Sequence, residues 1–451
     1  MKKLGTRLAL VASAALLLGG LTACADTAPG AQPSSEPHNT GLIDAAKEAA
    51  TAAMEAAGAD SGGSIRMVGV LTGGEEEALE AAIKPFEQAT GIEVDYEGSF
   101  DAPSLTETAI QAGNPPDIVD GVSVSTLQRY IDMGIVQPLN DLISEDDAAE
   151  YGTGLTDSVS KDGKLYAVWS EVDNFMVWYN ADNYSGDTPP ADWAALEKWS
   201  EEQADDGTVP WCNGLELGPA SGSPGSSFIE SLLVGANGDE IIQGLVDGSV
   251  PFTDPRVKAA FETWGKINAD PAMVYGGPEN VVATSMYDSG LPMFADPASC
   301  ELLFGGVFMG AATVAGTPEA VAGENLKFFP VPASDPANAG IEQVQGHVVY
   351  SLSDNPQALA FVKYWSSAEA QSVIASKNRW VVGNLSVPHD MYSDPNLQQA
   401  AARLQDADEI VVSGKMLLPA PVLSAFRAAT VKYVQNPAAL DDILAEIEAS
   451  R

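Results

Sequence analysis

The ordered part of the sequence begins near Ser64 with alternating strand and helix patterns. Residues 65–71, IRMVGVL, form a short apolar run before a glycine turn, which is typical of a buried strand. Between residues 75 and 90 the apolar side chains recur at helical spacing, and Gly91 follows as a helix stop. Residues 92–98, IEVDYEG, alternate apolar and polar positions as a strand does. The pattern predicts a β-α-β unit.

Later segments extend this alternation. Proline bounds a short predicted strand within residues 114–121, NPPDIVDG, and a helix is predicted before it, around 103–112. Further helices are predicted at three places: 253–267, two stretches within 355–376, and the C-terminal DDILAEIEAS. Such alternation favours an α/β fold with a mainly parallel sheet.

Ligands of such sheets bind where the strands end at their carboxyl edge. The loops that follow the first predicted strands are residues 71–75, 98–101 and 117–121. We therefore expect these loops to border a ligand cleft.

One apolar run is interrupted by polar residues. Residues 166–180 read YAVWSEVDNFMVWYN, so both ends are typical of a buried strand and the middle is not. The polar middle carries Glu171, Asp173 and Asn174. The two ends need not belong to the same core. A crossing between two domains would explain the interruption, because its middle would remain open to solvent.

The N-terminus has the pattern of an export signal. Lys2, Lys3 and Arg7 precede the apolar stretch 8–21, which is too short to be a good membrane span. The sequence LTAC then ends at Cys24 and resembles the lipobox of bacterial lipoproteins. We expect residues 1–23 to be a signal peptide and Cys24 to carry a lipid anchor; an ordinary secretory signal is the alternative.

Residues 24–63 are predicted to be a flexible tether, since 25–41 are rich in Pro, Ser, Gly and Ala. Residues 42–58 are Ala-rich with few large apolar groups. They are predicted to be a helical stalk rather than a core helix.

The composition allows two globular domains and excludes one class of function. About 390 residues remain after the export segment and tether, enough for two domains, and 45% of the chain is hydrophobic. There are 63 acidic and 22 basic residues, a net charge of −41. This excludes a protein that tracks nucleic-acid phosphates, because such proteins need a cationic face.

The sequence contains no motif for a metal or a cofactor, and we expect neither. His38, His347 and His389 are scattered, and no HExxH or CxxC motif occurs. The remaining cysteines, Cys212 and Cys300, have no histidine near them in sequence. Two cysteines outside the cytoplasm usually pair.

Several segments, in order, resemble one family. These are EEEALEAAIKPFEQATGIEVDYEG, AGNPPDIV, DGKLYAV with VWYN, TVPWCNGLELGPASGSPGSSFIESLLV, FTDPRVKAAFETWGKI and YGG. Together they resemble the extracellular solute-binding proteins of ABC importers, in the maltose-binding-like sugar group and its α-glucoside-binding branch. The resemblance covers residues from about 64 to 451.

The resemblance implies a two-lobed, hinge-linked α/β fold with a sugar held in the interlobe cleft. Lobe 1 would comprise residues 64–172 and 346–385, and lobe 2 residues 175–345 and 386–451. It also implies a Cys212–Cys300 disulfide in lobe 2. The expected partners are a sugar and the transmembrane permease subunits, and we expect a monomer.

Candidate ligand residues combine flat aromatic groups with hydrogen-bonding side chains, because sugars present both C–H faces and hydroxyls. They are Thr72, Gly73, Asp101, Trp169, Glu171, Asp173, Asn174, Phe228, His347 and Trp380. Trp380 is a candidate because a Trp in a polar, loop-like setting is unusual, and each of the others has a structural alternative. Trp169 and its polar neighbours can belong to an ordinary strand, Phe228 to a core, Asp101 to a turn cap, Thr72 and Gly73 to a tight turn, and His347 to a structural site.

This sequence differs from the family pattern at several positions that often bind the ligand. Leu71, Phe100, Asn174 and Ser223 stand where relatives often have Trp, Arg, Lys and Trp. The resemblance therefore predicts transport architecture and not the substrate; another oligosaccharide or a polyol remains open. A secreted carbohydrate-active enzyme and a surface sensor or adhesin are the competing functions, with Glu171 and Asp173 as the acid pair of such an enzyme.

Overall fold

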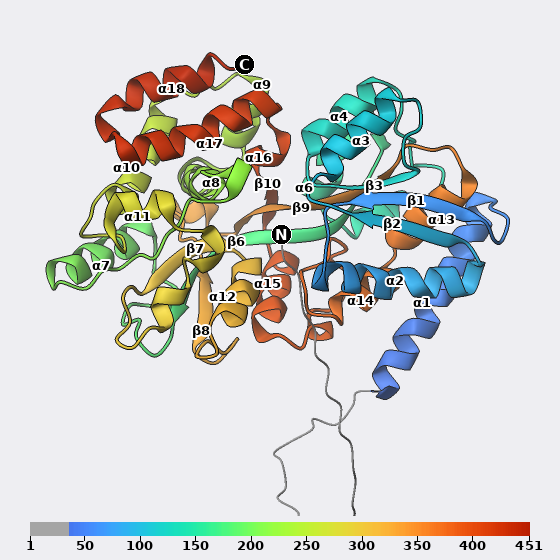
Figure 1. The fold of residues 1–451 in the computed structure, drawn as a ribbon, viewed down its shortest axis with the longest axis horizontal. Helices are drawn as coiled ribbons and strands as arrows, with labels where there is room; N and C mark the ends of the chain where they lie inside the picture. The colour runs from blue at the N-terminus through green and yellow to red at the C-terminus, as the bar shows by residue number, and fades with distance from the viewer. Residues whose placement is uncertain (1–35) are drawn as a thin grey trace, which may run out of the picture.

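The computed structural model describes residues 36–451. The predicted signal peptide, residues 1–23, and the predicted lipid-bearing Cys24 lie outside the described residues. The described chain forms two lobes bridged by β6 (Val168–Asn180) and β9 (Ile341–Ser351) (Figure 1). No helix in this part is both long and apolar enough to cross a membrane.

Lobe 1 is built on a sheet in the order β2-β1-β3-β9-β6. β1 (Ser64–Gly69) runs parallel to β2 (Glu93–Gly98) and β3 (Ile118–Gly121), and β3 runs antiparallel to β9. The helices of this lobe are α2 (Gly74–Thr90), α3 (Ala102–Gln111), α4 (Val124–Asp132), α5 (Glu145–Ala149), α6 (Thr153–Ser158), α13 (Pro356–Trp365) and α14 (Ala368–Ala375). Its core includes Phe86, whose ring meets that of Phe361 edge-on at 5.2 Å.

Lobe 2 is built around the second half of β6, which pairs antiparallel with β7 (Leu302–Gly306) and β8 (Leu326–Pro330). The surrounding helices are α7 (Trp193–Asp205), α8 (Ser223–Asn237), α9 (Glu240–Asp247), α10 (Pro255–Asn268), α11 (Gly277–Ala283), α12 (Phe308–Gly316), α16 (Gly414–Leu417), α17 (Ala420–Gln435) and α18 (Leu440–Glu448). α8 is buried along almost its whole length. It therefore forms the central helix of this lobe, as its apolar composition requires.

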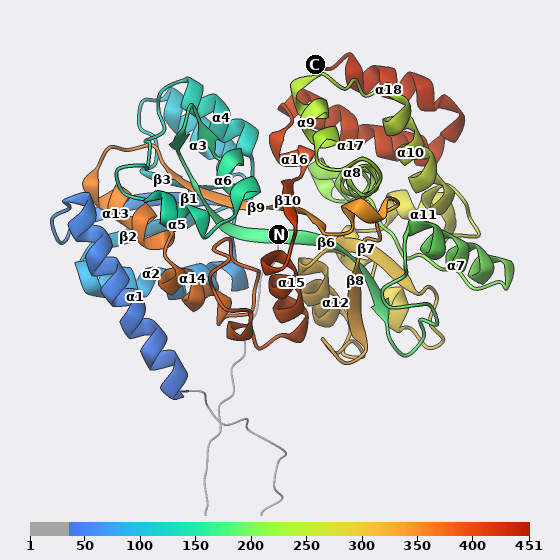
Figure 2. The same ribbon diagram turned by 180° about the vertical axis from the view of Figure 1, so that it is seen from behind.

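The two strands β6 and β9 change partners as they pass from one lobe to the other. Residues 168–174 of β6 pair with β9, whereas residues 175–180 pair with β7 and β8. β9 pairs with β10 (Glu409–Val412) over residues 341–344 and with β3 over 348–351. Figure 2 shows α15 (Pro395–Gln405) beside this crossing.

The predicted fold class and several predicted elements are confirmed. β1, α2 and β2 form the expected β-α-β entry, with Gly91 as the left-handed C-cap of α2. The helix predicted at 253–267 is α10, and Asp254 caps it by accepting a hydrogen bond from the Arg256 N–H. The stretch 355–376 forms two helices, α13 and α14.

The N-terminal helix differs from the flexible tether expected for residues 24–63. α1 (Glu36–Ala57) packs along α2, α13 and α14 of lobe 1 (Figure 2). Ala46, Ala50 and Ala53 are buried in this contact at helical spacing. The stalk prediction is wrong for this helix because it treated the lack of large apolar groups as a lack of packing. Small side chains instead let the helix backbones approach closely.

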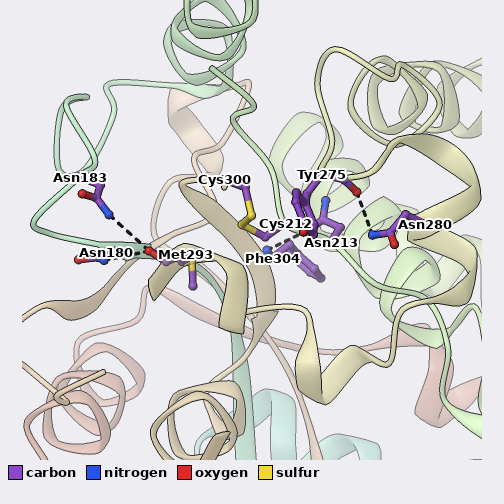
Figure 3. Close-up of a disulfide and its surroundings, with 9 residues drawn as sticks. All are labelled: Asn180, Asn183, Cys212, Asn213, Tyr275, Asn280, Met293, Cys300 and Phe304. Carbon is purple, nitrogen blue, oxygen red and sulfur yellow. Dashed lines mark hydrogen bonds between the residues drawn. A yellow bond between two sulfur atoms is a disulfide. The ribbon is translucent and has the colours of Figure 1, made fainter. Parts of the chain in front are cut away.

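The predicted disulfide is present in lobe 2. Cys212 and Cys300 are 88 positions apart, and their Cα atoms are 5.5 Å apart (Figure 3). The neighbouring Asn213 carboxamide oxygen accepts a hydrogen bond from the Phe304 N–H of β7. The disulfide therefore ties the segment that follows α7 to the residues just before β7.

Candidate functional site

Polar side chains gather on one face of the β6–β9 crossing. In the strand register Glu171 lies opposite His347, and Asp173 lies opposite Gln345. Residues two apart on a strand share a face, so these four side chains lie together, whereas Val172 and Asn174 point the other way. We call Asp120, Glu171, Asp173, Gln345 and His347 the crossing site.

His347 lies between two carboxylates of lobe 1. Its Nδ1 is 3.6 Å from Asp120 Oδ2 and its Nε2 is 3.8 Å from Glu171 Oε2. Burial lowers the pKa of His347, but the carboxylates of Glu171 and Asp120 outweigh it and raise the pKa to about 9. At neutral pH the imidazole is therefore charged.

For Glu171, burial outweighs the neighbouring positive charge in setting the pKa. Burial raises its pKa to about 7, despite the nearby His347, and the carboxylates of Asp173, Glu75 and Asp120 add to the rise. About 15% of its side chain remains exposed. Glu171 is thus a carboxyl group poised near neutrality that a ligand can reach.

Asp173 joins the two lobes. Its Oδ1 accepts hydrogen bonds from the N–H groups of Val307 (2.6 Å) and Phe308 (3.4 Å) just before and at the start of α12, and its Oδ2 accepts one from Gln345. Burial still raises the pKa of Asp173 to about 6. Only a glycine fits at Gly306, because a Cβ there would lie 2.2 Å from Asp173 Oδ2.

Lobe 2 contributes a second polar group. Gln343 donates to Glu230 Oε2 at 2.9 Å, and Ser413 also donates to that atom. Burial raises the pKa of Glu230 to about 7. Burial likewise lowers the pKa of Lys415 to about 8, although the carboxylates of Asp173 and Glu230 act against the fall.

Aromatic side chains accompany these groups. Tyr287 is 49% exposed, and its ring meets that of Phe308 at 6.2 Å. Burial raises the pKa of Tyr287, and the negative charges of Glu75 and Asp173 add to the rise. An exposed ring beside hydrogen-bonding groups is the arrangement that suits a sugar ring.

A large groove lies elsewhere. It has a volume of about 1270 Å³ and is lined by residues of α4, α6, α9 and β10 and by the loop before α17. None of its lining residues is aromatic, and none belongs to the crossing site. We therefore place the candidate ligand site at the crossing, where charged groups and rings converge, and not in this groove.

The structure brings some predicted site residues together. Glu171, Asp173 and His347 meet at the crossing. Gly73 precedes α2 with a left-handed φ of 61°, at an exposed position, and Thr72 lies half-buried before it. Asp101 is exposed at the start of α3 and its side chain makes no capping hydrogen bond.

Four predicted ligand residues are instead structural. Trp169 is fully buried and donates through Nε1 to the Leu155 carbonyl at 3.0 Å. Trp380 is buried and donates to the Ser170 carbonyl. Phe228 stacks on Phe304 at 4.1 Å in the lobe 2 core.

Asn174 is the fourth. It is buried on the other face of β6 and donates to Glu342 Oε2 at 3.0 Å. The sequence placed it in the crossing, but strand alternation turns it away from Asp173.

Sequence reasoning missed several residues at this site. Asp120 lay within a predicted cleft loop but was not singled out, and the same is true of Glu75. Tyr287 and Lys415 reach the site from segments with no distinguishing pattern. Among the described residues, no group of His, Cys, Asp and Glu is arranged to hold a metal ion.

A two-lobed α/β protein with polar groups on its crossing strands belongs to the class that holds a solute between two lobes. The profile of the bacterial extracellular solute-binding protein family matches residues 81–404, so the chain belongs to that family.

Curated relatives agree with this assignment. The chain is 27% identical to the osmoprotective compounds-binding protein GgtB of Synechocystis sp., over 82% of this chain and 88% of the relative. It is 28% identical to the alpha-glucosides-binding periplasmic protein AglE of Rhizobium meliloti, over 82% and 83%. The solved structure of the bacterial solute receptor AcbH, described as specific for β-D-galactopyranose, has the same fold. Its TM-score is 0.71 at 17% identity, over 86% of this chain and 97% of that one.

Proposed function

We propose that this protein captures a sugar, or a sugar-like polyol, for an ABC importer and hands it to the membrane permease. The observation that carries the proposal is the crossing site. Glu171 and Asp173 lie on the strand that joins the lobes, beside the exposed ring of Tyr287. A ligand bound there would contact both lobes at once and so favour their closed arrangement.

The names of the relatives support a saccharide. Two curated relatives that align over most of their length are described as binding alpha-glucosides and osmoprotective compounds. Hydroxyl-rich ligands of this kind suit carboxylates, which accept hydrogen bonds from adjacent hydroxyls. Binding of this kind needs no cofactor and no covalent step.

The working compartment lies outside the cytoplasm, as the family's description states. A lipid anchor on Cys24 would hold the monomer at the outer face of the cell membrane, beside the permease. The sequence LTAC supports this part of the proposal.

One observation favours a second candidate, a glycoside-cleaving enzyme. Glu171 has a pKa of about 7, the property of a general acid, and a second carboxyl, Asp173, lies two residues away. However, Asp173 is occupied by two N–H groups and Gln345. These contacts would hold it away from a nucleophile's role.

A saccharide panel tests the proposal and separates the two candidates. Thermal unfolding is followed with mono- to tetrasaccharides and polyols, and every compound that raises the melting temperature is incubated with the protein and analysed by chromatography. The transport function predicts a stabilising saccharide that is recovered intact. Cleavage products would favour the enzyme, and the absence of any stabilising compound would refute the sugar assignment.

A further inference from the structure

An exposed aromatic ring lies on the turn that follows β2 in lobe 1. Phe100 is 83% exposed, the highest value for a large apolar side chain within residues 36–451. The next residue, Asp101, is exposed as well, and its carboxylate accepts no hydrogen bond and forms no salt bridge in that part of the chain. The ring therefore adds little to the stability of lobe 1, and the carboxylate is free to accept hydrogen bonds from outside the chain.

Backbone contacts hold this turn in place. The Ser99 N–H donates to the Gly69 carbonyl of β1 at 2.9 Å, and the Asp101 N–H donates to Ser99 Oγ at 3.1 Å. Gly98 packs directly on the loop after β1, since a Cβ at this position would lie 2.3 Å from the Leu71 carbonyl oxygen. The ring and the carboxylate are therefore presented from a fixed backbone beside the loop that follows β1.

Strand directions place the turn on the side of lobe 1 that faces lobe 2. β2 and β3 both run parallel to β1. β3 and β6 are both antiparallel to β9, so β3 runs in the direction of β6, which leads into lobe 2 (Figure 1). The carboxyl ends of β1, β2 and β3 therefore point towards lobe 2. Because β2 is the outermost strand of this sheet, its turn is the one farthest from the crossing strands.

The turn lies two strands away from the crossing site. Gly98 of β2 is paired with Gly69 of β1, which is paired with Asp120 of β3. Neighbouring strands lie about 4.8 Å apart, so the end of β2 is roughly 10 Å from Asp120. A single pyranose ring bound at the crossing site does not span this gap, whereas a chain of linked rings does.

We propose that Phe100 and Asp101 form an outer subsite for a further pyranose ring, so that the ligand is an oligosaccharide rather than a single sugar. The inference rests on the proposed function and names the class of its ligand. The Phe100 ring packs against the C–H face of the outer sugar, and the Asp101 carboxylate accepts hydrogen bonds from its hydroxyls. A purely apolar group would use the ring and leave the carboxylate without a partner.

Calorimetric titration with saccharides of increasing length tests the outer subsite. One series is methyl α-glucoside, trehalose, maltose and maltotriose, and the other is methyl β-glucoside, cellobiose and cellotriose. Any other saccharide that stabilises the protein in the wider panel is titrated beside its own methyl glycoside. In at least one series a longer member should bind about tenfold more tightly than the methyl glycoside. 4-Nitrophenyl α-glucoside, whose second ring is apolar, should gain less than that saccharide does.

Variants connect the length preference to this turn. Phe100→Ala should reduce the preference to within about twofold, whereas Phe100→Tyr keeps a flat ring and should retain it. Asp101→Ala should also reduce the preference. Met133→Ala is the matched control, because Met133 is 51% exposed but lies at the far end of α4, and it should retain the full preference. The side chains replaced are exposed, so the melting temperature of each variant should match the wild type.

The outcomes separate this inference from the proposed function. Equal or weaker binding of every longer saccharide, or a panel in which only monosaccharides or polyols bind, would overturn the outer subsite and leave sugar capture standing. A length preference that survives Phe100→Ala would also overturn it. A gain for the nitrophenyl glucoside that the longer saccharides do not match would assign the ring to an apolar aglycone instead. If no probe binds and the wider panel fails as well, the proposed function falls and the outer subsite falls with it.

Discussion

The buried Asp173 carboxylate is predicted to reduce the stability of the folded protein near neutral pH, and Asp173→Asn tests this. Asp173 is 1% exposed, and burial raises its pKa from 3.8 to about 6. A shift of about two units corresponds to roughly 3 kcal/mol between the ionised and neutral forms. Asparagine has nearly the same shape and can still accept the Val307 N–H, but it carries no charge.

The pH dependence of this stability penalty follows from the difference in proton binding between the folded and unfolded states. Because the pKa is higher in the folded state, Asp173 costs nothing below about pH 4, and its penalty grows as the pH rises to 6. Asp173→Asn should therefore have about the wild-type stability at pH 4 and be more stable by up to about 3 kcal/mol at pH 7.5.

Urea unfolding of both proteins between pH 4 and 7.5 measures the effect, and the difference between them cancels the titration of other groups. Asp441→Asn is the control, since Asp441 is exposed and pairs with Lys258 at the surface. A stability difference that does not change with pH would refute the reasoning. A variant that is less stable than the wild type at pH 7.5 would also refute the reasoning. The hydrogen bonds of the Asp173 carboxylate would then outweigh the cost of burying it.

Three further changes have clear expectations. Trp169→Ala should lower the unfolding free energy by about 3–5 kcal/mol in denaturant titrations, because the ring is fully buried; a stable variant with weakened sugar binding would return Trp169 to the site. Replacing Cys212 and Cys300 by Ala should cost about 4–5 kcal/mol, as expected for a loop of 88 residues, and unchanged unfolding would contradict this. Ala50→Glu should destabilise lobe 1 by about 3 kcal/mol, whereas the same change at the exposed Ala52 should not; equal melting temperatures would show that α1 does not pack as described.

The spacing of apolar residues predicted the fold well, because burial of one face of a helix or strand imposes that spacing directly. The β-α-β entry, the capped start of α10 and the pair α13 and α14 all follow from local spacing and turn residues. The interrupted run at residues 166–180 also identified the crossing strand, since its polar middle lies where β6 changes partners.

The site was harder to predict because it depends on which face of a strand each side chain occupies. Glu171 and Asp173 share one face of β6, but their neighbour Asn174 points the other way. Tryptophans were favoured as sugar platforms, yet Trp169 and Trp380 each bury the indole and satisfy its N–H inside lobe 1. The exposed ring at the crossing belongs to Tyr287, which reaches it from a distant loop that no local pattern marks.

The central claim is that the ligand binds at the crossing site, and a co-crystal structure with the most stabilising saccharide tests it most directly. The account predicts sugar hydroxyls within hydrogen-bond distance of Glu171 and a ring against Tyr287. A saccharide bound instead in the 1270 Å³ groove beside α4, α6 and β10, with the crossing site empty, would contradict the account.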